Sequence, residues 1–407
     1  MDQLPYLESS HDTLRNRVRE FAEAEIAPVA ARLDVDSQFP WENVRKMADQ
    51  GLFGVNVPKE YGGQGLDYLS YILVIEELAR VDASHSITIS AHSTLGMSPI
   101  LSFGSEEQKR KYVPLLAAGR VLAGFGLTEP SAGSDAGASR TTAVRENGGW
   151  RLNGSKIFIT HAGVGEVFVV TAVTDRAQGT KGITNFIVTK PTTDLEAAQR
   201  VGVGHAPELE PFTEGVRAGK KEDKMGWRAS DTRELLLDNV YVSDENRVGP
   251  EGAGFINFMK TLDSGRIGIG ALSLGLAQGA FESAVRYAGG RRQFDKPLRD
   301  FQGIQFTLAE MATEIAAARH LVYHAAWLRQ NNQPYGNAAA MAKLYASEVA
   351  MKTTTRAVQL HGAHGYTNEY PVERMMRDAK ICEIGEGTSE VQKIVLARAI
   401  FKDLLGE

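Results

Sequence analysis

The 407-residue sequence contains a single cysteine, Cys382. An intrachain disulfide and a cysteine-based zinc site are therefore both excluded, which fits a reducing compartment. No stretch approaches the roughly 18 consecutive apolar residues of a membrane-spanning helix. The opening segment, MDQLPYLESS, is acidic and has no apolar core, so it predicts neither a secretory signal nor an arginine-rich transit peptide. We expect a protein of the cytoplasm, or of the mitochondrial matrix if the source is eukaryotic, that does not bind membranes.

A basic excess is also missing, because 45 Lys and Arg residues face 50 Asp and Glu residues and the net charge is -5. Proteins that bind nucleic acid usually carry a basic surface, so we expect no nucleic-acid partner, while a local basic pocket for phosphates stays compatible. The Rossmann, P-loop, H-E-x-x-H and G-x-S-x-G motifs are absent. The histidine pairs His320/His324 and His361/His364 lack a clear third ligand, so we predict no metal site.

What is present divides the chain into three parts. Residues 1–119 follow the helical period, which predicts an N-terminal all-α domain. Ser105 and Gln108 have the spacing of a capping box at the start of one helix. Gly119 predicts the C-terminal stop of that helix.

Residues 120–242 contain short β-branched runs between turn residues. Asn147 and Gly148, just before Trp150, predict a hairpin. Because most of these runs have no helical segment between them, we predict a middle domain built as an antiparallel β-barrel or sandwich. The polar segment 191–221 predicts a long loop or short excursion.

Residues 243–407 are helical again and predict a C-terminal four-helix bundle with a short final helix. The three long helices are expected over 267–287, 302–330 and 337–359. An apolar stripe marks the second of them, at Met311, Ile315, Ala318 and Val322. The predicted fold class is therefore α+β, multidomain, with helical domains on both sides of a β domain.

Eight short motifs follow one another along the chain: LTEPSAGSD (127–135), KIFIT (156–160), KMGWRASDT (224–232), LDSGRI (262–267), YAGGRRQF (287–294), QLHGAHG (359–365), RDA (377–379) and EGTSE (386–390). In this order they resemble the acyl-CoA dehydrogenase family across nearly the whole chain. The resemblance is strongest to short-chain and branched-chain members. It implies the same three-domain layout, bound FAD and assembly as a homotetramer.

The resemblance also implies the reaction, which is α,β-dehydrogenation of a short or branched acyl-CoA to the trans-2-enoyl-CoA. Proteins lack a hydride acceptor, so the flavin N5 would take the β-hydride, and electron-transferring flavoprotein would take the electrons. Glu386 matches the family's catalytic base. Other members carry this base on an earlier helix, at the position of Gly265 here. The alternative interpretation of Glu386 is a cap of the last helix.

Further site residues follow from the same motifs. Cofactor binding is implied for Phe125, Leu127, Thr128, Ser134, Phe158, Ile159, Thr160, Arg291, Gln293, Phe294, Gln302, Gln359, Gly362, Ala363, Thr388 and Glu390. Those from Arg291 to Ala363 match residues that reach the FAD of a neighbouring subunit. Substrate binding is implied for Ser134, Asp263, Arg266 and Gly387, with Asp263 and Arg266 at the nucleotide end of CoA. The simpler alternatives are strand propensity for the threonines, a solvated helix end at Arg291, and a surface ion pair for Asp263 and Arg266.

Several positions depart from the family pattern. Phe158 replaces a tryptophan, Ala363 and Asp295 replace glycines, and Gly385 replaces a tyrosine that often precedes the base. These departures leave the substrate's chain length and branching open. Two other functions also stay open: an acyl-CoA oxidase, whose reduced flavin reacts with oxygen, and a DNA-binding relative outside β-oxidation.

Overall fold

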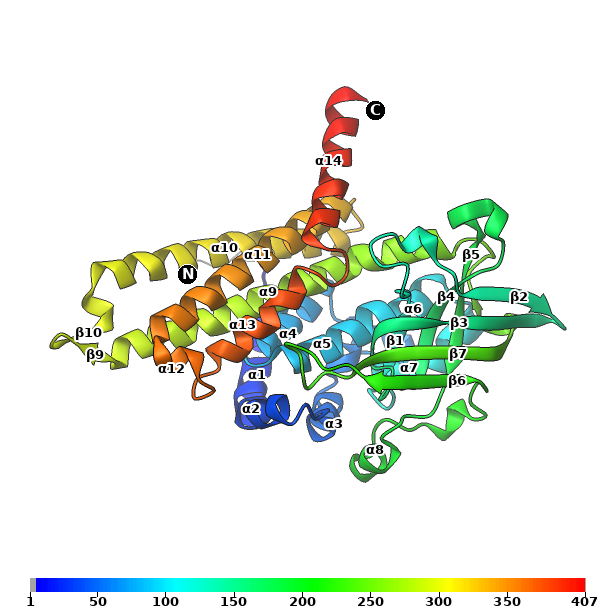
Figure 1. The fold of residues 1–407 in the computed structure, drawn as a ribbon, viewed down its shortest axis with the longest axis horizontal. Helices are drawn as coiled ribbons and strands as arrows, with labels where there is room; N and C mark the ends of the chain where they lie inside the picture. The colour runs from blue at the N-terminus through cyan, green and yellow to red at the C-terminus, as the bar shows by residue number, and fades with distance from the viewer. Residues whose placement is uncertain (1–4, 407) are drawn as a thin grey trace.

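The computed structural model describes residues 5–406. It places a β-sheet domain at one end of an elongated helical body (Figure 1). This arrangement confirms the predicted order of a helical N-terminal part, a middle sheet and a helical C-terminal part.

The N-terminal helices are α1 (Ser9–Phe21), α2 (Ala27–Val35), α3 (Trp41–Asp49), α4 (Tyr68–Ala79), α5 (Ala83–Ser90), α6 (Ser98–Phe103) and α7 (Glu106–Ala117). Between α5 and α6 the chain forms a π-helical segment, η4 (Ala91–Met97). The capping box is confirmed, because Ser105 Oγ accepts the Gln108 N–H at 3.2 Å and Gln108 Oε1 accepts the Ser105 N–H at 3.0 Å. Gly119 follows the end of α7 with a φ of 66°, as a C-terminal stop requires.

The middle domain is one sheet of eight strands. They are β1 (Ala123–Gly126), β2 (Thr142–Glu146), β3 (Gly149–Thr160), β4 (Val167–Val173), β5 (Ile183–Thr189), β6 (Val216–Lys221), β7 (Thr232–Ser243) and β8 (Arg247–Val248). The order is β6-β7-β3-β2-β4-β5-β8, with β1 paired to β4. All pairings are antiparallel except those of β1 and β2 with β4. The predicted hairpin joins β2 to β3, with Asn147 and Gly148 both at positive φ.

The segment 191–221 is more ordered than a long loop. It contains a short helix, α8 (Leu195–Val201), and the edge strand β6, which pairs with β7. The β6 sequence, VRAGKK, has a glycine and three cations and no apolar alternation, so only its pairing with β7 makes it a strand.

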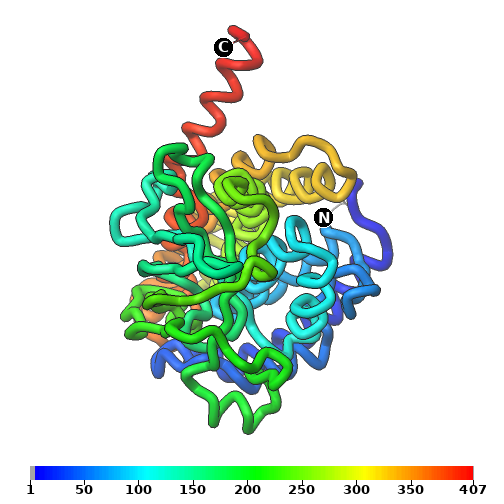
Figure 2. Tube along the Cα trace, turned by 90° about the vertical axis from the view of Figure 1, so that its right-hand side faces the viewer, coloured from blue at the N-terminus to red at the C-terminus, as the bar shows by residue number. Residues whose placement is uncertain are grey.

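The C-terminal helices are α9 (Gly254–Gly290), α10 (Gln302–Gln330), α11 (Gly336–His361), α12 (Ala363–Tyr366), α13 (Val372–Cys382) and α14 (Ser389–Leu405). The bundle consists of α9, α10, α11 and α13 (Figure 1). A small hairpin of β9 (Arg292–Gln293) and β10 (Lys296–Pro297) joins α9 to α10. The final helix is longer than predicted, with 17 residues, and extends away from the body, as Figure 2 also shows.

One apolar core spans the N-terminal and C-terminal helices. Ile72 and Ile75 of α4 and Leu272 and Leu274 of α9 are completely buried in it. The sheet has a core of its own around Trp150. A third cluster, with Phe125 of β1 and Phe258 of α9, lies where the sheet meets the helices, so α9 runs from the sheet through the length of the bundle.

Candidate active site

The loop that joins α13 to α14 presents Glu386. Glu386 and Gly387 both have left-handed backbone conformations, with φ values of 53° and 93°. Such a conformation is uncommon for a glutamate and persists only where surrounding contacts hold it. Thr388 supplies the cap of α14, because its hydroxyl oxygen accepts the N–H of Val391 at 3.3 Å. The alternative interpretation of Glu386 as that cap is therefore wrong.

The Glu386 carboxylate points at Gly265 on α9. A Cβ atom placed on Gly265 would lie only 1.9 Å from Oε2 of Glu386. Within residues 5–406, this oxygen is buried and has no hydrogen-bond partner. Burial raises the pKa of Glu386 to about 7, while the cations of Lys343 and Arg266 oppose that rise. An unpartnered carboxyl group that titrates near neutral pH has the properties of a general base.

Two buried cations flank the loop. Lys343 of α11 is completely buried, and its Nζ donates to the Gly387 carbonyl at 2.8 Å. Arg266 of α9 is 2% exposed and donates through Nη1 to Asp263 at 2.6 Å. The alternative of a surface ion pair fails for Asp263 and Arg266, because the arginine is buried. No motif in the sequence marks Lys343.

An aromatic wall on α4 lies beside the same loop. The Tyr68 hydroxyl donates to the Ser264 carbonyl at 3.1 Å, and the Tyr71 hydroxyl donates to Ser90 at 3.4 Å. Burial raises the pKa of Tyr68 to about 12 and that of Tyr71 well above its usual value, and the nearby Glu386 raises both further. The two phenols are therefore buried and neutral at physiological pH.

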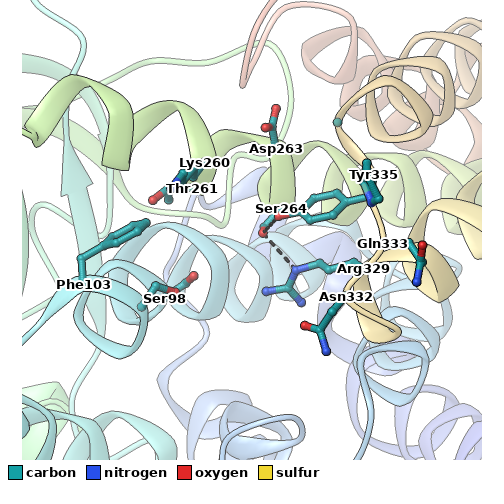
Figure 3. A pocket seen from close by; sticks show the side chains of 13 residues that line it. Ser98, Phe103, Lys260, Thr261, Asp263, Ser264, Arg329, Asn332, Gln333 and Tyr335 are labelled. Carbon is teal, nitrogen blue, oxygen red and sulfur yellow. Dashed lines mark hydrogen bonds between the residues drawn. The ribbon is translucent and has the colours of Figure 1, made fainter.

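A cavity of about 520 Å³ opens next to this site (Figure 3). Asp263 and Ser264 line it from α9, and Arg329 lines it from α10. The Nε of Arg329 donates to the Ser264 hydroxyl at 3.0 Å, and its guanidinium lies 3.6 Å from the ring centroid of Tyr68. Lys260 adds a second cation. Two cations and several hydroxyls suit a phosphate-bearing ligand.

The sheet contributes a second surface, formed by the motifs of residues 127–135 and 156–160. The Ile157 N–H donates to the Thr128 carbonyl at 2.8 Å, which brings the two motifs together. A buried ion pair supports them, with Lys156 Nζ 2.7 Å from Glu129 Oε1. The β3–β7 register shifts between Lys156 and Ile159, and Phe158 stands in this bulge at a φ of 57°.

The predicted cofactor residues of the sheet differ in exposure. The Phe158 ring is 62% exposed, so the bulge presents a planar aromatic face to a ligand. Thr128 and Thr160 are half-buried and Ser134 is exposed. Phe125 and Ile159 are buried, and the Phe125 ring stacks on Phe258 with a centroid distance of 5.8 Å. Leu127 is half-buried.

The remaining predicted cofactor residues lie at the other end of the bundle. The β9–β10 hairpin carries Gln293 and Phe294, and the nearby ends of α9, α10 and α11 place Arg291, Gln302, Gln359, Gly362 and Ala363 in the same region (Figure 1). All of these residues are exposed, and the Phe294 ring is 88% exposed. Within one chain these residues therefore lie far from Phe158. Glu390 is exposed on the first turn of α14.

Within residues 5–406 no three His, Cys, Asp or Glu side chains lie close enough together to hold a metal ion. None of the helices described is both long and apolar enough to cross a membrane. Cys382 is buried, and burial raises the pKa of its thiol to about 12, so it stays protonated.

Comparison with known proteins identifies the class. Three family models match the chain in order: the acyl-CoA dehydrogenase N-terminal domain at residues 8–120, the middle domain at 124–240 and the C-terminal domain at 252–401. The chain belongs to the acyl-CoA dehydrogenase family, whose members are FAD-dependent oxidoreductases.

Individual relatives agree with this assignment. A short-chain specific acyl-CoA dehydrogenase of Clostridium acetobutylicum is 49% identical over 97% of this chain and 99% of its own length. The butyryl-CoA dehydrogenase structure of Megasphaera elsdenii is 43% identical, with a TM-score of 0.91 over 98% of this chain and 100% of that one. A structure described as an electron transferring flavoprotein of Acidaminococcus fermentans is 46% identical, with a TM-score of 0.92 over 99% of this chain and 100% of that one.

Proposed function

We propose that this protein oxidises a short or branched acyl-CoA to the trans-2-enoyl-CoA, with Glu386 as the base that removes the α-proton. The observation that carries the proposal is the buried, unpartnered Oε2 of Glu386, which faces the open position at Gly265. Since the pKa of this carboxyl is about 7, a large fraction is ionised at neutral pH and ready to accept a proton.

Bound FAD supplies the acceptor for the β-hydride, which no side chain provides. The exposed Phe158 ring in its strained bulge fits a planar cofactor, with Thr128 and Thr160 as hydrogen-bonding groups at its polar edge. In the reaction, the protein holds Glu386 against the substrate's α-carbon, and the buried Tyr68 and Tyr71 exclude water. Low water content strengthens every electrostatic interaction in the site.

The rest of the FAD site belongs to a second copy of the chain in this proposal. The hairpin residues around Phe294 are exposed and far from Phe158 along the bundle (Figure 1). The helix α14 also leaves apolar side chains uncovered, including Ile400, Phe401 and Leu404. Both features support assembly into a homotetramer in which one subunit's hairpin contacts its neighbour's cofactor.

The substrate's CoA portion is assigned to the cavity beside α9. Arg329 and Lys260 supply cations for phosphates, and Asp263 lies on the same wall. The relatives named for short-chain acyl-CoA and butyryl-CoA support a short acyl group. The relative described as an electron transferring flavoprotein supports such a protein as the electron acceptor.

The test is Glu386→Gln, which keeps the size of the side chain and removes the base. We expect the variant to retain FAD and to bind butyryl-CoA, while flavin reduction in a stopped-flow experiment falls by about 10²- to 10⁴-fold. Wild-type reduction should rise with pH through about 7 as the carboxylate forms. Reduction within about tenfold of wild type would show that Glu386 is not the base. Peroxide release without an added acceptor would instead indicate an acyl-CoA oxidase.

A further inference from the structure

The most unusual buried group near the loop is Lys343. A lysine is almost never completely buried unless its ammonium group is compensated, yet Lys343 is 0% exposed. Within residues 5–406, Nζ makes one hydrogen bond, to the Gly387 carbonyl at 2.8 Å. The burial of this ammonium group is therefore compensated by the loop that carries Glu386.

The Gly387 carbonyl accepts a second hydrogen bond. Gln392 of α14 is also completely buried, and its Nε2 donates to the same oxygen at 2.9 Å. A Cβ on Gly387 would lie 2.7 Å from this nitrogen, so the contact also depends on glycine. Two donors on one carbonyl explain how the left-handed turn at Glu386 and Gly387 is maintained.

We propose that Lys343 is a positioning residue for the reaction: its buried ammonium group holds the Glu386–Gly387 turn through the Gly387 carbonyl and stabilises the ionised form of the base. The inference rests on the proposed role of Glu386 and extends it. Gln392 donates to the same carbonyl but carries no charge. Comparing variants of the two residues therefore distinguishes the hydrogen bond that holds the turn from the charge that stabilises the carboxylate.

The charged surroundings support this division. The titratable groups that face Glu386 are Lys343 from α11, Arg266 from α9, and Tyr68 and Tyr71 from α4. Lys343 and Arg266 each lower the pKa of the carboxyl, and the tyrosines are neutral. Burial lowers the pKa of Lys343 to about 8 and Arg266 lowers it further, while the carboxylates of Glu386 and Glu383 raise it. At pH 7, where Glu386 titrates, most of the lysine is therefore still cationic, because its pKa lies above that of the carboxyl.

The experiment compares Lys343→Met, Lys343→Gln and Lys343→Arg with Gln392→Met, all as FAD-loaded enzyme with butyryl-CoA. Flavin reduction is followed by stopped flow between pH 5.5 and 8. For Met and Gln at position 343 we expect the midpoint of the pH profile to rise by about one unit or more. The rate at pH 6 should then fall by about tenfold. Gln392→Met should lower the rate at all pH values alike and leave the midpoint in place.

A second readout does not depend on turnover. The carboxyl stretching band of protonated Glu386, assigned by its loss in Glu386→Gln, can be titrated by infrared spectroscopy without substrate. The same upward shift is expected for Lys343→Met and Lys343→Gln. A wild-type midpoint in these neutral variants, by either method, overturns the proposal.

The conservative variant keeps the test decisive if the neutral variants do not fold. Lys343→Arg keeps the charge at every pH used, so its midpoint should equal or lie below that of wild type, and a rise overturns the proposal. Glu386→Gln, measured in parallel, separates two failures. If Glu386→Gln reduces flavin normally, the base assignment is wrong, whereas an inactive Glu386→Gln beside unshifted Lys343 variants rejects only the role of Lys343.

Discussion

Gly265→Ala adds one methyl group to the helix surface that faces the base. The new Cβ would lie 1.9 Å from Oε2 and 3.1 Å from the carboxyl carbon of Glu386, and ordinary contact begins at 3.4 Å. The carboxylate must therefore move by about 1.5 Å, and a misplacement of about 1 Å in an active site can lower the rate by about 10²-fold. We expect a loss of flavin reduction of at least this size.

Gly265→Ala should be more stable than wild type although it is less active. Alanine favours a helix over glycine by about 1 kcal/mol, and the displaced atoms belong to the end of a side chain rather than to the backbone. A matched control exists in the same helix, because a Cβ on Gly289 meets nothing within 4 Å. Gly289→Ala should gain helix stability without displacing Glu386, so its stability is the reference for that of Gly265→Ala.

The assay is stopped-flow reduction of bound FAD by butyryl-CoA, with thermal unfolding of both variants as the measure of stability. A Gly265→Ala variant that folds normally and reduces flavin within about threefold of wild type would refute the need for this space. That result would mean that the Glu386 side chain can reach an equally productive position without the space at Gly265.

Three further outcomes are expected. Glu386→Gln should melt at a higher temperature than wild type at pH 8 and show no such gain at pH 5. The raised pKa means that folding favours the protonated carboxyl, so this contribution to the stability of the wild type is lost as pH rises through about 7. An equal difference in melting temperature at both pH values would contradict the raised pKa of this carboxyl. Gly385→Tyr should lower kcat/KM more for isobutyryl-, 2-methylbutyryl- and cyclohexanecarbonyl-CoA than for butyryl-CoA. A Cβ at Gly385 meets no atom closer than 3.5 Å, so the tyrosine ring would occupy free space beside the acyl group. Equal losses on all four esters would exclude a steric role. Arg291→Ala should weaken FAD retention and the proposed tetramer together, measured by flavin absorbance and analytical ultracentrifugation. The reason is that this residue is proposed to reach the FAD of a neighbouring subunit, where its guanidinium would suit the pyrophosphate. A yellow tetramer with unchanged FAD affinity would reject that role.

Features that depend on neighbouring residues in the chain could be predicted from the sequence. Ser105 and Gln108 cap a helix through contacts three residues apart, and Asn147 and Gly148 form a turn by their own backbone preferences. The strand β6 could not be predicted, because its sequence has no apolar alternation and only its pairing with the next strand, β7, makes it a strand.

The candidate site divides in the same way. Glu386 could be proposed as the base because a family motif surrounds it, and this role stays a prediction; the structure adds that its carboxylate faces Gly265. Lys343 could not be identified, since its meaning comes from a carbonyl 44 positions further along the chain. The strained bulge at Phe158 depends on a register shift against β7, which no local pattern encodes.

The shared helical core has a consequence for synthesis on the ribosome. Every residue of α4 is buried, and this helix packs against α9 and α10, which are made only after the whole sheet has been translated. The N-terminal helices therefore emerge long before the partners that cover Ile72 and Ile75. During that interval the nascent chain exposes an apolar helix that native folding later hides, which makes it a substrate for holding chaperones and a source of aggregation when translation stalls before α9.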